Sequence, residues 1–233
     1  MSAGHPVHKH VAERPRLLLW FDYSCPFCYV DHSRFERLAT VHDVEIVSVP
    51  FELRPSLPPE GTSARAAGLE HSERVAAYLA RVARDEGIEI VERDLVPNTH
   101  QALLLGEVAR DAGPALHRAF HVGVFDAMFG RGLDIGNRDV LLDVAEAAGL
   151  PRETAGTAWT DARFGQRVHS FRHLATALGV TATPAALICN QLLIGSRPVA
   201  VLEEAISRCL LTLADAQAET VPPTVEDQGE ALQ

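Results

Sequence analysis

Apolar and polar positions follow three successive patterns at the start of the chain, and each pattern predicts a different element. Residues 16–21 form a short continuous apolar run, which is typical of a strand buried on both faces. From Pro26 onward apolar residues recur every three or four positions, which predicts a helix. Residues 44–51 alternate and are rich in β-branched side chains, so they predict a second strand. This order predicts parallel strands joined by a right-handed crossover.

Helical periodicity dominates the middle of the chain. Residues 52–61 are rich in proline and predict a loop that leaves the sheet. Between residues 62 and 178 the only stretch that resembles a strand is 88–91. Asn98 and Asn137 each precede a helical pattern, where an asparagine side chain can cap free backbone N–H groups. The expected helices are 70–86, 98–113, 115–129, 137–149, 151–159 and 163–178.

Strand signals return near the end of the chain. Two short apolar runs flank the polar pair Asn190-Gln191, which predicts a β-hairpin, and a helix is expected over 199–213. The predicted fold class is α/β, with a thioredoxin-like βαβ–ββα core and a large helical insertion. In this interpretation residues 16–61 and 179–213 form the discontinuous core, 62–178 the inserted helical domain, and 1–15 and 214–233 flexible tails.

Composition narrows the classes of partner. The 233 residues include 47% apolar and 22% charged side chains, as in ordinary globular proteins. Lys+Arg 21 against Asp+Glu 31 gives a net charge of −10, which argues against nucleic acid and anionic membranes. No apolar run approaches the roughly 18 residues of a membrane span, and no secretory leader is recognised. We therefore expect a cytoplasmic protein, in which the four cysteines are not a structural disulfide framework.

Cys25 and Cys28 lie where the first strand meets the first helix. A cysteine at a helix N-terminus ionises more easily, because free N–H groups and the helix dipole favour an anion there. Cys25 is thus the candidate attacking thiol, and Cys28 would resolve the mixed disulfide that it forms. No dissociable cofactor is required, although a thiol donor such as glutathione could supply electrons. Cys189 and Cys209 are expected to be buried free thiols without a function.

Several segments resemble the DsbA-like branch of the thioredoxin superfamily, and within it the cytoplasmic FrnE-type proteins. The resemblance covers about residues 16–210 and is carried by Asp22-Tyr23-Ser24-Cys25-Pro26-Phe27-Cys28-Tyr29, Pro97-Asn98-Thr99, Asn137 to Leu150 and Gly179-Val180-Thr181-Ala182-Thr183-Pro184. In that family the late proline is cis and packs against the dithiol, which implies this role for Pro184. The resemblance also implies that Pro26, Phe27 and Thr183 shape the substrate site.

This chain departs from the family pattern at three positions. Ala182 and Thr183 stand where the family usually has glycine and valine. Phe27 stands where FrnE-type proteins usually have tryptophan and periplasmic relatives have histidine. Because a phenylalanine offers no hydrogen bond to a thiolate, we expect a less oxidising dithiol than in the periplasmic relatives. Substrate preference stays open.

Asp22 lies three residues before Cys25, at the end of the predicted strand. A carboxylate beside a dithiol can accept a proton from the resolving thiol, so Asp22 is a candidate proton relay. A solvated or capping aspartate is the alternative interpretation. The backbone next to Pro184 is a candidate for pairing with an extended substrate.

The sequence therefore predicts a thiol–disulfide oxidoreductase that acts on protein or small-molecule thiols, without nucleic acid or membrane partners. Its oligomeric state is open. An alternative is a glutathione-dependent enzyme resembling 2-hydroxychromene-2-carboxylate isomerases and kappa-class transferases, which use one Ser or Cys at the Cys25 position. Cys28 argues against it. The third alternative is a non-catalytic zinc-binding protein, although a structural zinc site needs four ligands and there is no second Cys-x-x-Cys.

Overall fold

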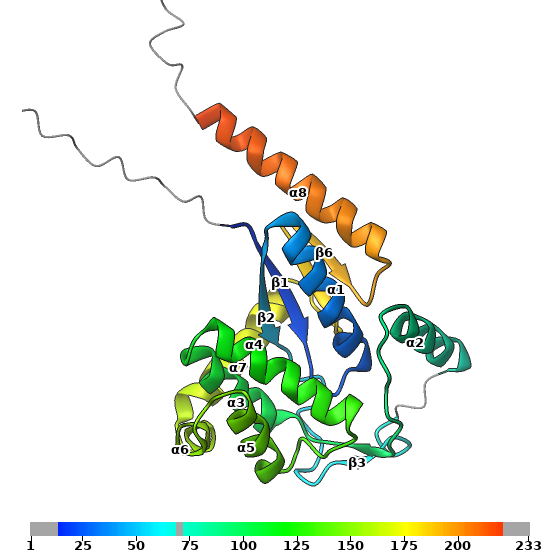
Figure 1. Cartoon of the computed structure of the whole chain (residues 1–233), viewed down its shortest axis with the longest axis vertical. Helices are drawn as coiled ribbons and strands as arrows, with labels where there is room; N and C mark the ends of the chain where they lie inside the picture. Colours follow the sequence, from blue (N-terminus) through cyan, green and yellow to red (C-terminus); the bar gives the residue numbers. More distant parts are fainter. Residues whose placement is uncertain (1–13, 69–71, 221–233) are drawn as a thin grey trace, which may run out of the picture.

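A four-stranded mixed sheet lies at the centre of the thioredoxin-like part of the chain (Figure 1). The computed structural model describes residues 14–68 and 72–220. The strands are β1 (Arg16–Phe21), β2 (Glu45–Pro50), β5 (Ala185–Ile188) and β6 (Gln191–Ile194), in the order β2-β1-β5-β6. Strand β1 pairs in parallel with β2 and antiparallel with β5. Strands β5 and β6 pair antiparallel across the turn at residues 189–190. The predicted parallel pairing of the first two strands and the predicted hairpin are therefore confirmed.

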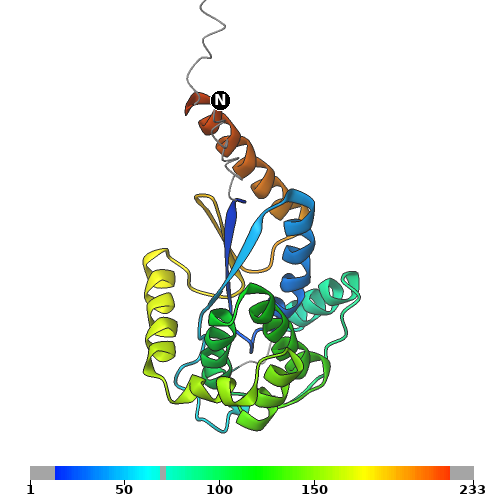
Figure 2. The same ribbon diagram turned by 60° about the vertical axis from the view of Figure 1, so that its left-hand side comes forward.

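Helices cover both faces of this sheet, which explains why β1 is apolar along its length. On one face Leu17 and Leu19 pack with α1 (Pro26–His42) and α8 (Val199–Thr220). On the other face Trp20 packs with Ala175 of α7 (Ala162–Ala177). Figure 2 shows α1 in blue and α7 in yellow on opposite sides of the sheet. Burial on both faces is what a continuous apolar strand requires.

Four further helices form a second core at one end of the sheet (Figure 1). They are α3 (His100–Asp111), α4 (Pro114–Phe125), α5 (Arg138–Ala147) and α6 (Arg152–Gly156), with a π-helical segment at Asp126–Gly130 and a 3₁₀ turn at Thr157–Trp159. Phe120, Phe125 and Phe164 are fully buried at the centre of this core. Cys25 and Cys28 belong to the same cluster, so the dithiol lies where the sheet meets the helical part.

The chain between the sheet and α3 differs from expectation. Residues 88–91 are not a strand. Instead β3 (Thr62–Ser63) and β4 (Leu95–Val96) form a small antiparallel ribbon, and α2 (Glu73–Asp85) lies between them in sequence. Strands of two residues are too short to leave a hydrophobic pattern. These two strands form because the chain brings residues 62–63 next to residues 95–96, and no local sequence pattern predicts that contact.

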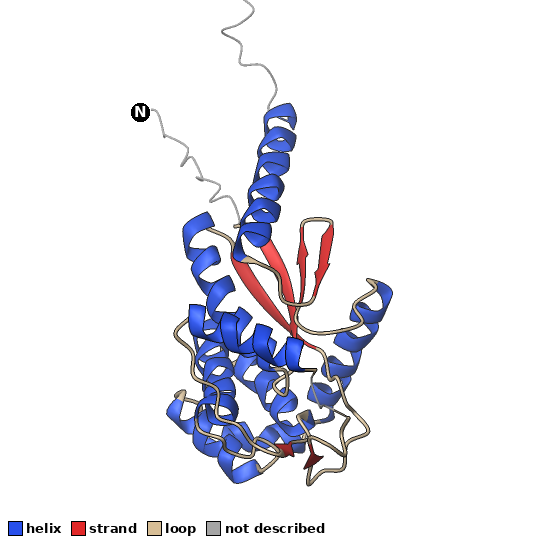
Figure 3. Cartoon of the chain, turned by 90° about the vertical axis from the view of Figure 1, so that its right-hand side faces the viewer, coloured by secondary structure: helices blue, strands red, loops and turns tan. Residues whose placement is uncertain are grey.

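Helix α8 is longer than its sequence pattern predicts. It continues to Thr220, so the flexible tail expected from residue 214 is wrong for residues 214–220. Figure 3 shows α8 projecting past the end of the sheet. Three of these residues are alanine, which has the highest helix propensity. The predicted tails at 1–13 and 221–233 lie outside the described residues.

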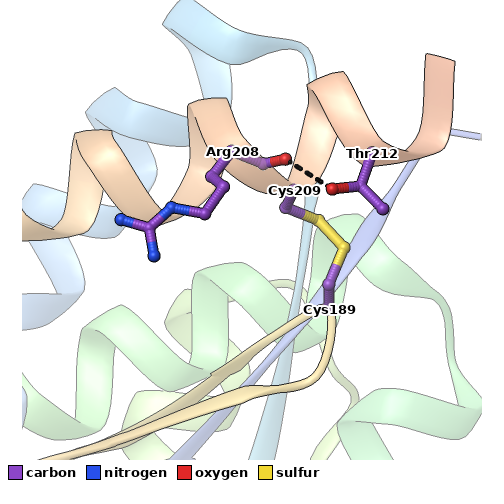
Figure 4. Close-up of a disulfide and its surroundings, with 4 residues drawn as sticks. All are labelled: Cys189, Arg208, Cys209 and Thr212. Atoms are coloured by element: carbon purple, nitrogen blue, oxygen red, sulfur yellow. Dashed lines mark hydrogen bonds between the residues drawn. A yellow bond between two sulfur atoms is a disulfide. The ribbon is translucent and has the colours of Figure 1, made fainter. Parts of the chain in front are cut away.

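A disulfide joins Cys189 to Cys209, which contradicts the expectation that both are free thiols (Figure 4). Cys189 lies in the turn of the β5–β6 hairpin and is exposed, whereas Cys209 lies on the buried face of α8. Their Cα atoms are 5.7 Å apart, within the usual range for a disulfide. Sequence alone could not show that this turn faces α8. The bond ties the hairpin to the last helix.

Among the described residues, no helix combines the length and the apolar character needed to cross a bilayer.

Candidate active site

Cys25 is the N-cap residue of α1, as the sequence predicts. Its backbone is extended, and its carbonyl accepts hydrogen bonds from the N–H groups of Cys28 and Tyr29 at 3.0 and 3.3 Å. Pro26 occupies the first turn, where its missing N–H has no intrahelical partner to lose. The remaining free N–H groups and the helix dipole favour negative charge at this end of the helix. The fold thus places Cys25 where a thiolate is stabilised.

The two cysteines are both free and buried, but their acidities differ. A hydrogen bond from Cys28 is the main cause that lowers the pKa of Cys25, against the opposing effect of burial. Burial raises the pKa of Cys28 well above its ordinary value, and the neighbouring Cys25 sulfur raises it further. Cys25 therefore ionises first, and the Cys28 thiol donates a hydrogen bond to the thiolate.

Thr183 lies directly against the dithiol, although it is 158 residues from Cys25 in sequence. The Cys25 thiol donates to the Thr183 carbonyl at 3.4 Å, and the Thr183–Pro184 peptide bond is cis. The Thr183 Oγ1 atom is buried and has no hydrogen-bond partner among the described residues. Its side chain also lowers the pKa of both cysteines. An unpaired hydroxyl here is a donor that a thiolate can use.

Replacing Thr183 by valine keeps the side-chain shape and removes that donor. We expect the pKa of Cys25 to rise and its alkylation by iodoacetamide at pH 7 to slow about tenfold, since a hydrogen bond to a charged group contributes about 1.5–3 kcal/mol. The rate profile between about pH 5 and pH 9 should shift to higher pH. Thr183→Ser should restore the wild-type profile. Equal profiles for wild type and Thr183→Val would exclude a role for the hydroxyl.

Asp22 is completely buried beneath the dithiol loop, and its carboxylate is fully engaged. Its Oδ1 accepts from the backbone N–H and hydroxyl of Ser24 at 2.7 and 2.8 Å, and its Oδ2 accepts from the Leu53 N–H and the Thr99 hydroxyl at 2.7 and 3.3 Å. Burial raises the pKa of Asp22, while these hydrogen bonds act in the opposite direction. The interpretation of Asp22 as a solvated residue is therefore wrong.

Sequence analysis missed Thr99 as a partner of Asp22. Thr99 is the residue before α3, whereas Asn98 was expected to cap that helix. The Asn98 side chain does accept from the His100 N–H at 2.9 Å, and it also donates to the Leu57 carbonyl at 2.7 Å. The only sequence feature that pointed to Thr99 is the segment Pro97-Asn98-Thr99, which contributes to the family resemblance. A threonine in this segment is a candidate hydrogen-bond donor to a buried acid.

A cavity of ≈ 480 Å³ opens beside the dithiol loop. Ser24 and Pro26, the two neighbours of Cys25 in sequence, line it together with Met128 and Phe129, whereas Cys25 and Thr183 are not among its lining residues. Phe27 is half-buried and packs towards α2, with its ring 6.0 Å from that of Tyr78. Pro26 therefore lines this cavity, whereas Phe27 packs against two hydrophobic clusters.

The described parts of the chain contain no group of three or more His, Cys, Asp and Glu side chains that could hold a metal ion.

Solved structures of several other proteins share this architecture. The probable DsbA oxidoreductase SCO1869 of Streptomyces coelicolor is 23% identical, with a TM-score of 0.73 over 90% of this chain and 93% of that one. A 2-hydroxychromene-2-carboxylate isomerase is 20% identical, with a TM-score of 0.68 over 86% and 98%. The cytosolic disulfide reductase DsbM of Pseudomonas aeruginosa with GSH is 16% identical, with a TM-score of 0.61 over 87% and 99%. At these identities the comparisons show the fold alone.

Sequence comparison extends this relation to family level. The uncharacterized protein YwbO of Bacillus subtilis (strain 168) is 28% identical over 193 residues, which cover 81% of this chain and 94% of YwbO. The family model of the DSBA-like thioredoxin domain matches residues 16–207, most of the chain. The matched segment includes the dithiol, the helical insertion and the Thr183–Pro184 bond. The chain therefore belongs to the DSBA-like thioredoxin domain family.

Proposed function

We propose that this protein is a thiol–disulfide oxidoreductase that uses Cys25 and Cys28. The observation that carries the proposal is the opposite displacement of the two thiol pKa values within one buried pair. The attacking cysteine needs a low pKa because only its thiolate is nucleophilic. The resolving cysteine acts only after the mixed disulfide has formed, so it can stay protonated until then. Membership of the DSBA-like family supports the same conclusion.

The proposed reaction begins with attack of the Cys25 thiolate on a substrate disulfide. A mixed disulfide forms, and one substrate sulfur leaves as a thiolate. Cys28 then loses its proton and attacks the Cys25 sulfur, which releases the second substrate thiolate. The protein gains a Cys25–Cys28 disulfide as the substrate accepts two electrons, and a thiol donor such as glutathione would reverse this change. Protein or small-molecule thiols and disulfides are the proposed substrates.

A redox titration tests this proposal most directly. The full chain is equilibrated in glutathione buffers of graded potential, its free thiols are alkylated, and the modified residues are located by mass spectrometry. We expect a reversible two-electron couple at Cys25 and Cys28. The Cys189–Cys209 bond should titrate as a separate couple. Absence of a Cys25–Cys28 disulfide at every accessible potential would refute the proposal.

Asp22 is proposed as a proton acceptor for Cys28 during the resolving step. If so, Asp22→Asn should slow resolution of a glutathione mixed disulfide on Cys25 by about tenfold or more, because general base catalysis contributes about 10²–10⁴-fold. Alkylation of Cys25 itself should not slow. Thr99→Val is the matched control, since it removes one hydrogen bond and keeps the carboxylate. Equal slowing in both variants would indicate a structural role only.

A glutathione-dependent isomerase or transferase is the second candidate function. The similarity to 2-hydroxychromene-2-carboxylate isomerase in fold favours it. Such an enzyme would use Cys25 alone, so the requirement for Cys28 distinguishes the two candidates.

A cytoplasmic location, without nucleic acid or membrane partners, is also proposed. The negative net charge and the cytosolic disulfide reductase among the structural neighbours support it. The Cys189–Cys209 bond weighs against it, because the cytosol keeps most thiols reduced. Cell fractionation with an antibody to the full chain would decide the location.

A further inference from the structure

Two buried polar residues of α1, Asp31 and Arg34, have no part in the proposed reaction. Asp31 is 2% exposed and Arg34 is 4% exposed. The Arg34 Nη1 atom donates to Oδ1 of Asp31 at 3.2 Å, and its Nε atom donates at 3.0 Å to Glu86, which caps the C-terminus of α2. The hydroxyl of Ser196 donates to the same Asp31 oxygen at 2.7 Å. These four residues, the Asp31 network, therefore join α1 to α2 and to the segment that follows β6.

Ser196 lies at the open end of the β5–β6 hairpin, across from the cis peptide bond. Just beyond the last paired residues of the two strands, the Gly195 N–H donates to the Pro184 carbonyl at 2.7 Å. The next residue outward on one side of this hydrogen bond is Thr183, and on the other side it is Ser196. The cis segment and Ser196 are therefore held together by the end of the hairpin.

These contacts form a closed ring that begins and ends on α1. At one point of the ring the Cys25 thiol donates to the Thr183 carbonyl at 3.4 Å, and at the other Asp31 accepts from Ser196. Because a helix holds its residues at a fixed spacing, the two contacts together set the position and the tilt of the cis segment relative to Cys25. The Thr183 hydroxyl, which has no partner among the described residues, belongs to the part of the chain that this ring holds.

Stability alone does not account for a carboxylate at Asp31. Burial raises the pKa of Asp31 to about 6, although the hydrogen bond from Ser196 and the charge of Arg34 act in the opposite direction. An acid whose pKa is higher in the folded than in the unfolded chain lowers the stability of the folded state at neutral pH, where it is ionised. Buried ion pairs are in general weak contributors to stability. A residue that costs stability is typical of a functional site.

We propose that Asp31 and Ser196 are positioning residues of the dithiol site, because their hydrogen bond holds the Thr183–Pro184 segment against Cys25. The inference rests on the proposed thiol–disulfide exchange and adds to it two residues that act through another segment. With the bond in place, the Thr183 hydroxyl can donate to the Cys25 thiolate, and the backbone beside Pro184 keeps its orientation for an extended substrate. Without it, the end of the hairpin can move away from α1, which weakens both interactions.

The variant Ser196→Ala removes the hydroxyl of a half-buried residue and creates no large cavity. We expect alkylation of Cys25 by iodoacetamide at pH 7 to slow at least about threefold, because the thiolate loses part of its hydrogen bonding. The rate profile between about pH 5 and pH 9 should shift to higher pH. Ser196→Thr keeps the hydroxyl and should retain the wild-type profile.

Ser33→Ala is the matched control for this change. The Ser33 hydroxyl lies in the same region, where it donates to the Val30 carbonyl at 3.0 Å and to Glu86 at 3.5 Å, but it does not bond to Asp31. Its Cys25 profile should equal that of the wild type. Equal profiles for wild type and Ser196→Ala, or an equal shift in Ser33→Ala, would overturn the proposal.

Asp31→Leu removes the acceptor and keeps a side chain of similar shape. It should shift the Cys25 profile by about the same factor as Ser196→Ala, since either change breaks the same hydrogen bond. A folded Asp31→Leu variant with the wild-type profile would exclude Asp31 from this role. If Asp31→Leu does not fold, the Ser196 variants decide the matter.

A double-mutant cycle with Thr183→Val tests whether the effect passes through Thr183. Ser196→Ala should slow alkylation of Cys25 in the wild type but not in a chain that already carries Thr183→Val. Slowing by the same factor in both backgrounds would refute the proposed route. The redox titration separates this inference from the proposed function. A Cys25–Cys28 couple with an unchanged Ser196→Ala profile overturns the positioning role alone, whereas absence of the couple overturns the function.

Discussion

Serine in place of Cys25 is expected to lower thiol–disulfide exchange at least about a thousandfold, because a serine hydroxyl is not ionised near neutral pH. The fold offers no second nucleophile at this place: the other thiol of the pair, Cys28, is fully buried and its pKa is raised. The measurement is the rate of reduction of insulin, with dithiothreitol as the electron donor. A Cys25→Ser variant that retains a substantial fraction of the activity would contradict the assignment of Cys25 as the attacking residue.

Cys28→Ser is the matched variant, and it separates the two candidate functions. In an oxidoreductase this change leaves the attack by Cys25 intact and prevents release, so a mixed disulfide with substrate should accumulate. Mass spectrometry of the protein after incubation with oxidised glutathione would show an added glutathione on Cys25. A glutathione-dependent isomerase has no resolving step. Full turnover by Cys28→Ser, combined with loss of activity in Cys25→Ser, would therefore favour the isomerase.

The parts of the fold that could be predicted are those with a strong local signal. The apolar run of β1 predicts burial on both faces, and Trp20 is indeed fully buried. Proline at the start of α1 and the asparagine before α5 mark helix starts that the structure confirms, since Asn137 accepts from the Asp139 N–H. These features depend on hydrogen bonds and packing within a few residues, and such information is present in a short window of sequence.

The dithiol site could be predicted only in part. The position of Cys25 follows from local pattern, whereas the place of Thr183 beside it required a family resemblance. The burial of Asp22 and its contact with Thr99 required knowledge of how α3 meets the end of β1. Contacts of this kind join segments separated by 77 or more residues. A hydrophobic pattern along the sequence does not predict such contacts, because an aspartate or a threonine can occur in many structural surroundings.

The sequence does not predict the Cys189–Cys209 bond, because the contact between the hairpin turn and α8 has no local pattern. We expect this bond to contribute strongly to stability. The bond closes a loop of 20 residues, for which chain-entropy arguments give about 3 kcal/mol of stabilisation. It also ties together two parts of one hydrophobic cluster, since Ile188 of the hairpin and Ile206 of α8 both belong to it. Reduction of the bond should therefore lower the free energy of unfolding without removing the apolar contacts.

A variant with Cys189→Ser and Cys209→Ala is expected to melt roughly 6–12 °C below the wild type, because about 3 kcal/mol corresponds to such a shift in a chain of this size. Both proteins should carry Cys25→Ala and Cys28→Ala, so that the Cys189–Cys209 bond of the parent is the only disulfide that dithiothreitol can reduce. Dithiothreitol should then lower the melting temperature of the parent to that of the variant and leave the variant unchanged. A parent whose melting temperature does not respond to dithiothreitol would show that the bond contributes nothing to stability. Loss of stability in the variant alone would indicate a packing defect at position 209, where the side chain is 6% exposed.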